Sequence, residues 1–304
     1  MAAVASCSVL APVDAPAYRG LAFPRHRPLL LDDLHTGGTV AVGAELAGQP
    51  IGLALAGPSG GDVASLHAVV VAASVRGRGI GGQLLGTLEA AMHARGVRRL
   101  VAAHRSDRPN SDLVGRLLAR AGYERSGAVV EFVFSVPRVA QAPVLRVSCS
   151  QAEVIAHTPE RLAALCAVRE PSGMDPGALS ADDVDPMLAT LVAVDGQSAA
   201  CMLGRREGHD TAYASLLFVR PDLRRRTRLA AFTVRRFLER LTAHGISTLT
   251  CEVSLDNAES LAFVDQRLSP FAEHRAVVHI VGKTIGPLES TDAFRGESPQ
   301  AETR

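Results

Sequence analysis

A cluster of glycines and arginines between two apolar segments has the composition of an anion-binding loop. The sequence Arg76-Gly77-Arg78-Gly79-Ile80-Gly81-Gly82 directly follows a β-branched apolar run, residues 66–71. Alternate glycines allow the backbone to turn tightly and leave its N–H groups uncovered by side chains. From Ile80 to Gly96 apolar residues recur at helical spacing, so the glycines also begin an amphipathic helix. Free N–H groups at a helix N-terminus, beside two guanidinium groups, predict a phosphate or pyrophosphate ligand.

Two nucleotide-binding motifs can be compared with this loop. A P-loop requires Lys followed by Ser or Thr, and Ile80-Gly81-Gly82-Gln83 stands there instead. Gly77, Gly79 and Gly82 do fit the Gly-x-Gly-x-x-Gly spacing of dinucleotide-binding folds. That motif also needs a ribose-binding carboxylate about 20 residues further on, where residues 95–99 are basic. Both interpretations are therefore disfavoured.

The loop resembles the pyrophosphate loop of the GNAT N-acyltransferase superfamily. That loop reads Arg/Gln-x-x-Gly-x-Gly/Ala between a strand and a helix, and Arg76 to Gly81 matches it at every position. The resemblance implies acetyl-CoA or another acyl-CoA as co-substrate and no metal. It also implies that backbone groups of the preceding strand hold the pantetheine arm and the thioester oxygen. The implied CoA-binding residues are Val69, Val70, Val71, Arg76, Gly77, Arg78, Gly79, Ile80, Gly81, Gly82, Asn110 and Ser111.

The reaction that this resemblance implies is the attack of an amine on a thioester. Such a site must align both substrates and remove a proton from an ammonium group. His67 and His104 are candidate bases, because an imidazole with a pKa near about 6.5 accepts a proton at neutral pH. At a repeat offset of 149 residues their counterparts are the apolar Leu216 and Val253. The structural alternative for each histidine is a hydrogen-bonded core residue.

The general acid departs from the family pattern. GNAT enzymes commonly carry a Tyr four residues before the Gly of a Gly-Phe/Tyr pair, and here Leu118 precedes Gly122-Tyr123. A thiol with a pKa near about 8.5 can leave unaided. Otherwise Tyr123, Tyr18 or water donates the proton, or the protein binds CoA without acylating anything.

The order of elements predicts two copies of one fold. The first copy is expected to contain a hairpin at residues 39–56 and, after the central strand, loop and helix, a final strand at 129–136 that closes the sheet. The pair Gly245 and Gly96 gives an offset of 245 − 96 = 149, and Gly196 and Gly48 give 196 − 48 = 148. We therefore predict an α/β (α+β) chain of two tandem GNAT folds, each with a mixed, mostly antiparallel central sheet flanked by helices.

The expected boundaries follow from this repeat. Residues 1–138 form the N-terminal GNAT domain, which binds acyl-CoA and is catalytic. Residues 139–143 form a linker, residues 144–283 a degenerate C-terminal GNAT domain, and residues 284–304 a disordered tail. In the second copy Arg226, Arg228 and Ala230 replace the loop glycines, so this copy is not expected to bind CoA productively. The arrangement is distantly similar to mycothiol synthase, in which the C-terminal copy is the competent one.

Composition limits the other classes of function. The chain has 304 residues, 47% of them hydrophobic, and a formal net charge of +1. This balance gives no electrostatic case for nucleic acid or an anionic membrane as partner. Five cysteines without a Cys-x-x-Cys pair indicate neither a disulfide framework nor a zinc site. No apolar run is long enough to span a bilayer, and the cytoplasm is the expected location.

The sequence thus predicts a GNAT N-acyltransferase, acting as a monomer or weak homodimer. It is expected to transfer an acetyl or longer acyl group from CoA to a primary amine of a small molecule or peptide. An acyl carrier protein is an alternative donor, because residues 224–228 are rich in Arg. A non-catalytic CoA-binding or interaction protein is the alternative from a different class.

Overall fold

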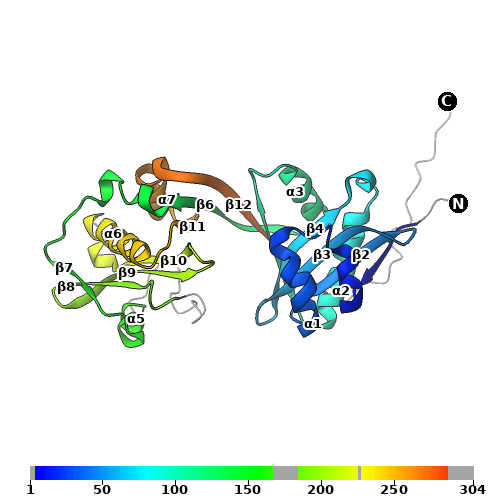
Figure 1. The fold of residues 1–304 in the computed structure, drawn as a ribbon, viewed down its shortest axis with the longest axis horizontal. Coiled ribbons are helices and arrows are strands. Elements are labelled where there is room, and N and C mark those ends of the chain that lie inside the picture. Colours follow the sequence, from blue (N-terminus) through cyan, green and yellow to red (C-terminus); the bar gives the residue numbers. More distant parts are fainter. Residues whose placement is uncertain (1–3, 167–183, 225–226, 287–304) are drawn as a thin grey trace, which may run out of the picture. The chain divides into compact units, whose positions relative to one another are not determined.

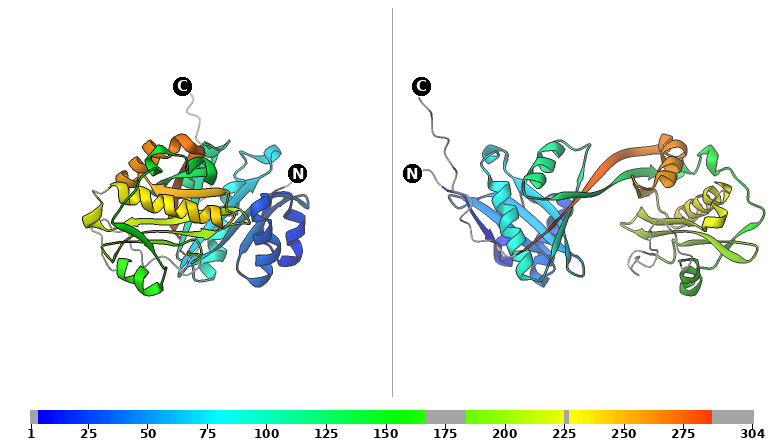
Figure 2. Two further views of the ribbon diagram at one scale, coloured as in Figure 1. Left: turned by 60° about the vertical axis from the view of Figure 1, so that its left-hand side comes forward. Right: turned by 180° about the vertical axis from the view of Figure 1, so that it is seen from behind.

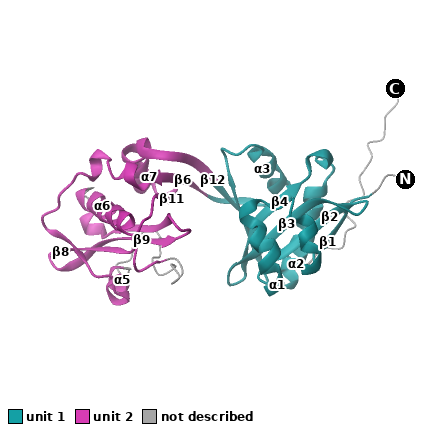
Figure 3. Cartoon of the chain, viewed as in Figure 1, with its two compact units in different colours: residues 1–127, 279–304 teal, residues 128–278 magenta. Residues whose placement is uncertain are grey.

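The computed structural model describes residues 4–166, 184–224 and 227–286. Contacts divide the chain into two compact units, shown in Figure 3. Unit 1 comprises residues 1–127 and 279–304, and unit 2 comprises residues 128–278. Strands β6 (Glu124–Ser135) and β12 (Ala272–Thr284) therefore contribute residues to both units. Each half of the chain gives part of its last strand to the unit formed by the other half.

Unit 1 is built on a sheet in the order β1-β2-β3-β4-β5-β12 (Figure 1). The first four strands pair antiparallel, and β4 pairs with β5 in parallel. A parallel pair needs a crossover connection, which helix α2 supplies. The bounds of these elements are β1 Ser6–Val9, β2 Val40–Leu46, β3 Gln49–Gly60, β4 Val63–Val71, α2 Ile80–Ala94 and β5 Arg99–Arg105.

The two faces of the unit 1 sheet are covered by different segments (Figure 2). On one face α2 buries Leu84 and Leu88 in a core shared with Val42 of β2, and α3 (Ser111–Arg120) adds Leu118. The other face packs against short helical turns between Pro12 and Thr36, which include α1 (Leu34–Thr36). Alternate residues of β3 point to opposite faces, so one helix and one set of turns can each bury a separate core.

Lys283, the only lysine of the chain, attaches the end of β12 to helix α2. Its Nζ lies 2.6 Å from Oε2 of Glu89, and the two side chains are 27% and 14% exposed. The ammonium group also lies 5.8 Å from the centre of the Tyr123 ring. The pair sits where β12 joins a sheet formed by the other half of the chain, so it helps to fix that strand.

We expect Lys283→Met to lower the free energy of unfolding by about 2 kcal/mol, because a charged hydrogen bond is lost and Glu89 remains partly buried. Urea unfolding measures this change. The double variant Lys283→Met/Glu89→Leu should recover most of the loss, since no unpaired charge remains. If the single variant were as stable as the unmodified protein, the pair would not fix the strand.

Unit 2 repeats this architecture with a sheet in the order β6-β11-β10-β9-β8-β7 (Figure 1). Helix α6 packs on β8, β9 and β10, and Phe237 is fully buried in the core of this unit. No helix among the described residues is both long and apolar enough to cross a membrane. The bounds are β7 Ala152–Ile155, β8 Thr190–Val194, β9 Gln197–Arg206, β10 Thr211–Val219, β11 Thr248–Ser254, α4 Val136–Val139, α5 Pro159–Cys166, α6 Thr227–Ala243 and α7 Ala258–Arg267.

The structure confirms the internal repeat through matching turns. In the β2–β3 hairpin Ala47 and Gly48 have φ of +50° and +75°, and Asp195 and Gly196 in the β8–β9 hairpin have +51° and +76°. Gly96 and Gly245 both end their helices in the left-handed conformation, the usual helix C-terminal arrangement. The offset is therefore 148 at the hairpins and 149 after the long helices, as the sequence predicts.

Strand β6 differs from the expectation that residues 129–136 close the N-terminal sheet. Its residues 129–135 pair antiparallel with β11, from Ser135 opposite Thr248 to Val129 opposite Ser254. Phe132 and Phe134 are buried in the core of unit 2. Alternation along a strand determines which residues face a core, but it does not determine which neighbouring strand is the partner.

The segments expected as a linker and a tail also differ in part. Val139 and Ala142 are buried in the core of unit 2, because Pro137 and Pro143 begin short helical turns, a position that proline favours. At the C-terminal end, Ile285 is 4% exposed and its N–H donates to the Arg98 carbonyl at 2.8 Å. The rest of the expected tail, residues 287–304, lies outside the described residues.

Candidate functional site

The loop between β4 and α2 has the backbone conformation that the glycine spacing predicts. Gly77 and Gly79 have φ of +80° and +79°, values that L-residues with a Cβ rarely adopt. A Cβ added at either position would meet no atom within 4 Å. Glycine is therefore required here by the backbone conformation, and the space in front of the loop is open.

This loop presents a row of unbonded N–H groups. Helix α2 has no side-chain cap at Gly79, and its first bonded amides are those of Gly82 and Gln83, which donate to the Gly79 carbonyl at 3.0 and 3.2 Å. The five amides directly before them have no backbone acceptor within the described part of the chain. Donors that converge at a helix N-terminus suit a phosphate or diphosphate. The unbonded groups are those of Gly77, Arg78, Gly79, Ile80 and Gly81.

Arg76 stabilises the loop from its side. Its Nε donates to the Val71 carbonyl at 3.0 Å, so the side chain folds back onto the end of β4. In unit 2 the Nε of Arg224 donates to the Val219 carbonyl at 3.3 Å. The two contacts are equivalent at an offset of 224 − 76 = 148, so this part of the loop is retained in both copies.

Strands β4 and β5 diverge next to this loop. Their last pair is Leu66 opposite Ala102, although β4 continues to Val71. Val69 and Val71 pair on their other side with Ala54 and Gly52 of β3. The edge of residues 69–71 that faces β5 is therefore unpaired within the described residues. Unpaired backbone groups at a strand edge can bind an extended ligand that contains amides.

His67 lies on a β-bulge, which changes the face it occupies. Leu55 pairs with Ala68 and Ala56 with Leu66, so His67 is the extra residue of β4. Leu66, Val69 and Val71 pack on the core beside α2. His67 therefore does not share a face with Val69 and Val71, as regular alternation along the strand would place it, because a bulge shifts the alternation by one residue.

The predicted counterpart of His67 in the second copy is also corrected by the register. In unit 2 the bulge falls at Ser215, between Ala214 and Leu216, at an offset of 215 − 67 = 148. The equivalent residue is thus polar Ser215 and not Leu216. The counterpart of His104 remains Val253, because β11 follows β5 at an offset of 149.

His67 belongs to a histidine cluster on the face covered by the N-terminal turns. Its ring centre lies 6.2 Å from that of His26, and a Cβ on Gly57 would lie 3.0 Å from its Nε2. The Nε of Arg25 donates to Nε2 of His26 at 3.0 Å. Burial, reinforced by Arg25 and partly opposed by Asp33, lowers the pKa of His67. The imidazole is therefore neutral and able to accept a proton at pH 7.

His26 is 8% exposed, and its pKa shift is the larger of the two. Burial, with smaller contributions from Arg25 and His67, lowers the pKa of His26 to about 4. Its Nδ1 is buried and has no hydrogen-bond partner among the described residues. Since Nε2 accepts from Arg25, the neutral ring carries its proton on Nδ1.

A buried neutral histidine makes stability depend on pH. Protonation favours the unfolded chain, so the stabilising contribution is complete above the unfolded pKa near about 6.5 and is lost as the pH falls toward the folded value. Urea unfolding should show a loss of about 2 kcal/mol between pH 7 and pH 5, much of which His26→Gln removes. His35→Gln is the control, because His35 is exposed. If the free energy of unfolding of His26→Gln fell with pH as steeply as that of the unmodified protein, His26 would not be the group responsible.

His104 lies on the opposite face from His67. It follows Leu100 and Ala102, which are buried in the core beside α2, and it faces Gly115 of α3, where a Cβ would lie 3.4 Å from Cε1. Its Nδ1 is 3.3 Å from Oγ of Ser111. The His279 ring centre lies 5.2 Å away. Burial and His279 lower the pKa of His104. The two candidate bases thus serve different sides of the sheet.

The remaining predicted residues surround α3. Asn110 has φ of +69° and precedes the helix without capping it through its side chain. Leu118, at the position of the family's Tyr, is 2% exposed. Tyr123 is buried in the core, its hydroxyl has no hydrogen-bond partner among the residues that the structure describes, and burial with Glu89 raises its pKa. The structure therefore places Tyr123 beside the Lys283 pair, where its phenol is a poor proton donor.

Sequence reasoning missed three polar neighbours of the predicted bases. Arg25 and His26 lie between two prolines, in a segment to which the sequence analysis assigns no site residue. His279 reaches His104 from β12, and it is 175 residues away in the chain, by 279 − 104. The sequence Pro-Arg-His was an available signal for the first two. No local signal could have placed His279, because β12 belongs to the second half of the sequence.

Comparison with known proteins agrees with this architecture. Residues 12–123 match the model of the acetyltransferase (GNAT) family. No curated protein matches the sequence. Among solved structures, a tandem GNAT protein from the clavulanic acid biosynthesis pathway is 15% identical with a TM-score of 0.62, and the match covers 94% of this chain and all of that one. The chain therefore has the GNAT fold in its tandem form, and the predicted fold class is confirmed.

Two further structures share this fold. A GCN5-related N-acetyltransferase from Sphaerobacter thermophilus is 19% identical with a TM-score of 0.64, and the match covers 93% of this chain and 96% of that one. A glucosamine N-acetyltransferase region of a fungal multi-domain GH3 β-N-acetylglucosaminidase is 14% identical with a TM-score of 0.63, and the match covers 93% of this chain and 38% of that one. At these identities the likeness concerns the fold alone.

Proposed function

We propose that unit 1 is an acyl-CoA-dependent N-acyltransferase that acylates a primary amine of a small molecule or peptide. The observation that carries the proposal is the row of free N–H groups from Gly77 to Gly81 at the start of α2. Together with Arg78, these groups suit the diphosphate of CoA. The unpaired edge of residues 69–71 lies next along the chain and suits the amides of the pantetheine arm.

The reaction needs no covalent enzyme intermediate. The amine nitrogen forms a bond to the thioester carbonyl carbon, and the carbon–sulfur bond then breaks to release the CoA thiolate. A backbone N–H of Val70 or Val71 is assigned to the developing oxyanion. His67 is assigned as the base that takes the ammonium proton, because it is neutral and faces the N-terminal turns, away from the core beside α2. The nitrogen of the adduct loses its second proton, which passes through water to the thiolate, so that CoA leaves as the thiol.

His104 is assigned a positioning role on the other side of the sheet. Its contact with Ser111 holds the start of α3, which the family resemblance assigns to the pantetheine arm together with Asn110. Tyr123 has no part in this assignment, because its hydroxyl is buried in the core. The protein is expected to act in the cytoplasm as a monomer or weak homodimer.

The test is transfer of label from radiolabelled acetyl-CoA to a library of primary amines by the purified full chain. Transfer to at least one amine, lost in Gly79→Val, supports the proposal. The buried Leu118 at the position of the usual proton donor favours a second candidate, a CoA-binding protein without transferase activity. That candidate would be favoured if the protein bound CoA tightly but transferred an acyl group to no amine, from either acetyl-CoA or an acyl carrier protein.

A further inference from the structure

Unit 2 contains a ligand-sized pocket of its own. Its volume is about 780 Å³, within the range of roughly 300–1,000 Å³ typical of small-molecule sites. The floor is apolar and is formed by the end of β10, by α6 and by α7. Its main apolar side chains are those of Val147, Leu217, Val219, Ala231 and Phe263.

An inner chamber adjoins this pocket. Leu217 and Phe263 line both spaces, and the chamber adds about 140 Å³ bounded by Phe134, Met202 and Leu238. It lies where β10 and β11 diverge, because their last pair is Ala214 opposite Cys251. Most of its lining is apolar, which favours an apolar group, although Ser215, Glu252, Ser254, Asn257 and Ser260 also line it. The two spaces together have the form expected for a flexible hydrocarbon chain.

The mouth of the pocket is mainly cationic. Arg224, Arg228 and Arg267 line it, as do the carboxylates Asp256 and Glu259 at the start of α7. Arg228 and Arg267 are exposed, and neither has an ion-pair partner among the described residues. Guanidinium groups bind carboxylates through paired hydrogen bonds. An anionic head group is therefore favoured at the mouth.

The same pocket is poorly suited to a diphosphate. The sequence has no glycine between Gly208 and Gly245, so the loop before α6 contains none of the residues that free the N–H groups in unit 1. The offset of 149 residues found at the helices places Arg228 at the position of Gly79 and Ala230 at that of Gly81. Recognition at this mouth thus depends on side-chain charge instead of a backbone cradle.

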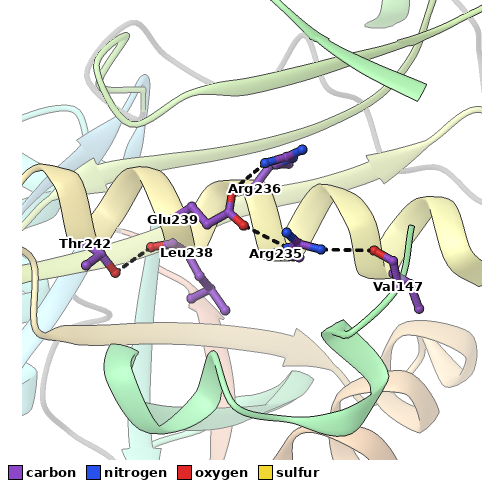
Figure 4. Close-up of polar contacts among 6 residues, drawn as sticks. All are labelled: Val147, Arg235, Arg236, Leu238, Glu239 and Thr242. Atoms are coloured by element: carbon purple, nitrogen blue, oxygen red, sulfur yellow. Dashed lines mark hydrogen bonds and ion pairs between the residues drawn. The ribbon is translucent and has the colours of Figure 1, made fainter. Parts of the chain in front are cut away.

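Figure 4 shows the polar contacts that join α6 to Val147, a residue of the pocket lining. Arg235 donates through Nη1 to the Val147 carbonyl at 3.2 Å, and its Nε bonds Glu239 at 2.8 Å. Arg236 bonds the other oxygen of Glu239 at 2.7 Å. The contact of Arg235 with the Val147 carbonyl joins the segment that carries Val147 to α6.

We infer that unit 2 binds a single-chain amphipathic carboxylate of the fatty-acid type. The hydrocarbon chain occupies the pocket and the inner chamber, and the carboxylate meets Arg228 and Arg267. This site is separate from the proposed acyltransferase site of unit 1. Cys251 lines the inner chamber, but a free carboxylate does not acylate a thiol, so the proposed binding is non-covalent.

The test is calorimetric titration of the full chain with dodecanoate below its micellar concentration. One dodecanoate per chain is expected, and Arg228→Ser/Arg267→Ser should weaken binding at least tenfold. Ala262→Trp places a large side chain at the exposed edge of the pocket and should weaken it by a similar factor. Circular dichroism verifies the fold of both variants. Arg78→Ser in unit 1 is the matched control and should bind dodecanoate normally.

Three results would overturn the inference: no binding of dodecanoate, binding that both unit 2 variants leave unchanged, or displacement of dodecanoate by CoA. The last would show that this pocket is a second CoA site. Failure of the proposed function is measured separately, by titration with CoA. If Gly79→Val bound CoA as well as the unmodified protein does, the proposal for unit 1 would fail, and the inference about unit 2 would not be affected.

Discussion

Replacement of Gly79 by Val is expected to lower the affinity for CoA at least about 100-fold, while the fold remains intact. Gly79 has φ of +79°, and a β-branched residue there costs roughly 1–2 kcal/mol or turns the loop. Its methyl groups also enter the open space in front of the N–H groups. Loss of even two charge-assisted hydrogen bonds, each worth about 1.5–3 kcal/mol, accounts for this factor.

Gly86→Val is the matched control for this prediction. Gly86 lies within the same helix, has no positive φ, and a Cβ there would meet nothing within 4 Å. The control should therefore bind CoA like the unmodified protein. Isothermal titration of both variants, with circular dichroism as a test of folding, measures the difference. Equal affinities in the two variants would show that the diphosphate binds elsewhere.

Replacement of His67 by Ala is expected to lower kcat/KM about 100- to 1,000-fold, the contribution usual for a general base. His104→Ala should have an effect of about tenfold and act mainly on the KM for acyl-CoA, because His104 contacts Ser111 at the start of α3 and serves the donor side. The measurement is steady-state kinetics with an amine found in the library. A larger loss in His104→Ala than in His67→Ala would reverse the assignment.

The pH profile provides an independent readout of the same base. A base must be unprotonated to act, and burial lowers the pKa of His67 below its ordinary value of 6.5. The rate should therefore fall only as the pH drops below 6.5, and this acidic limb should disappear from the residual activity of His67→Ala. An acidic limb that persists in the variant would assign the proton transfer to another group.

The central strand, loop and helix were predictable because their signals are local. Alternate glycines predicted a tight turn with uncovered N–H groups, and Gly77 and Gly79 have positive φ in that turn. The helix from Ile80 follows from the 3.6-residue spacing of its apolar residues. Paired glycines at the hairpins and helix ends revealed the repeat, because only a few residue types adopt those conformations.

The departures from expectation are non-local. Alternation in β6 predicted a strand, but its pairing with β11 depends on which core accepts Phe132 and Phe134. The bulge at His67 has no marker in the sequence, and a single extra residue moved this side chain to the other face. The contacts of His67 with His26, and of His104 with His279, join segments distant in the chain. The pattern of residues along the sequence does not show which distant segments come into contact.

The most direct test of the central proposal is the amide spectrum of the loop itself. In protein labelled with ¹⁵N-glycine, with Gly77 and Gly79 assigned from Gly→Ala variants, addition of CoA should move both resonances strongly downfield, because their N–H groups would donate to phosphate oxygens. Gly208 and Gly245, on either side of the equivalent loop of unit 2, should remain unchanged. If saturating CoA left the resonances of Gly77 and Gly79 unshifted, the proposal that this loop binds the diphosphate would be contradicted.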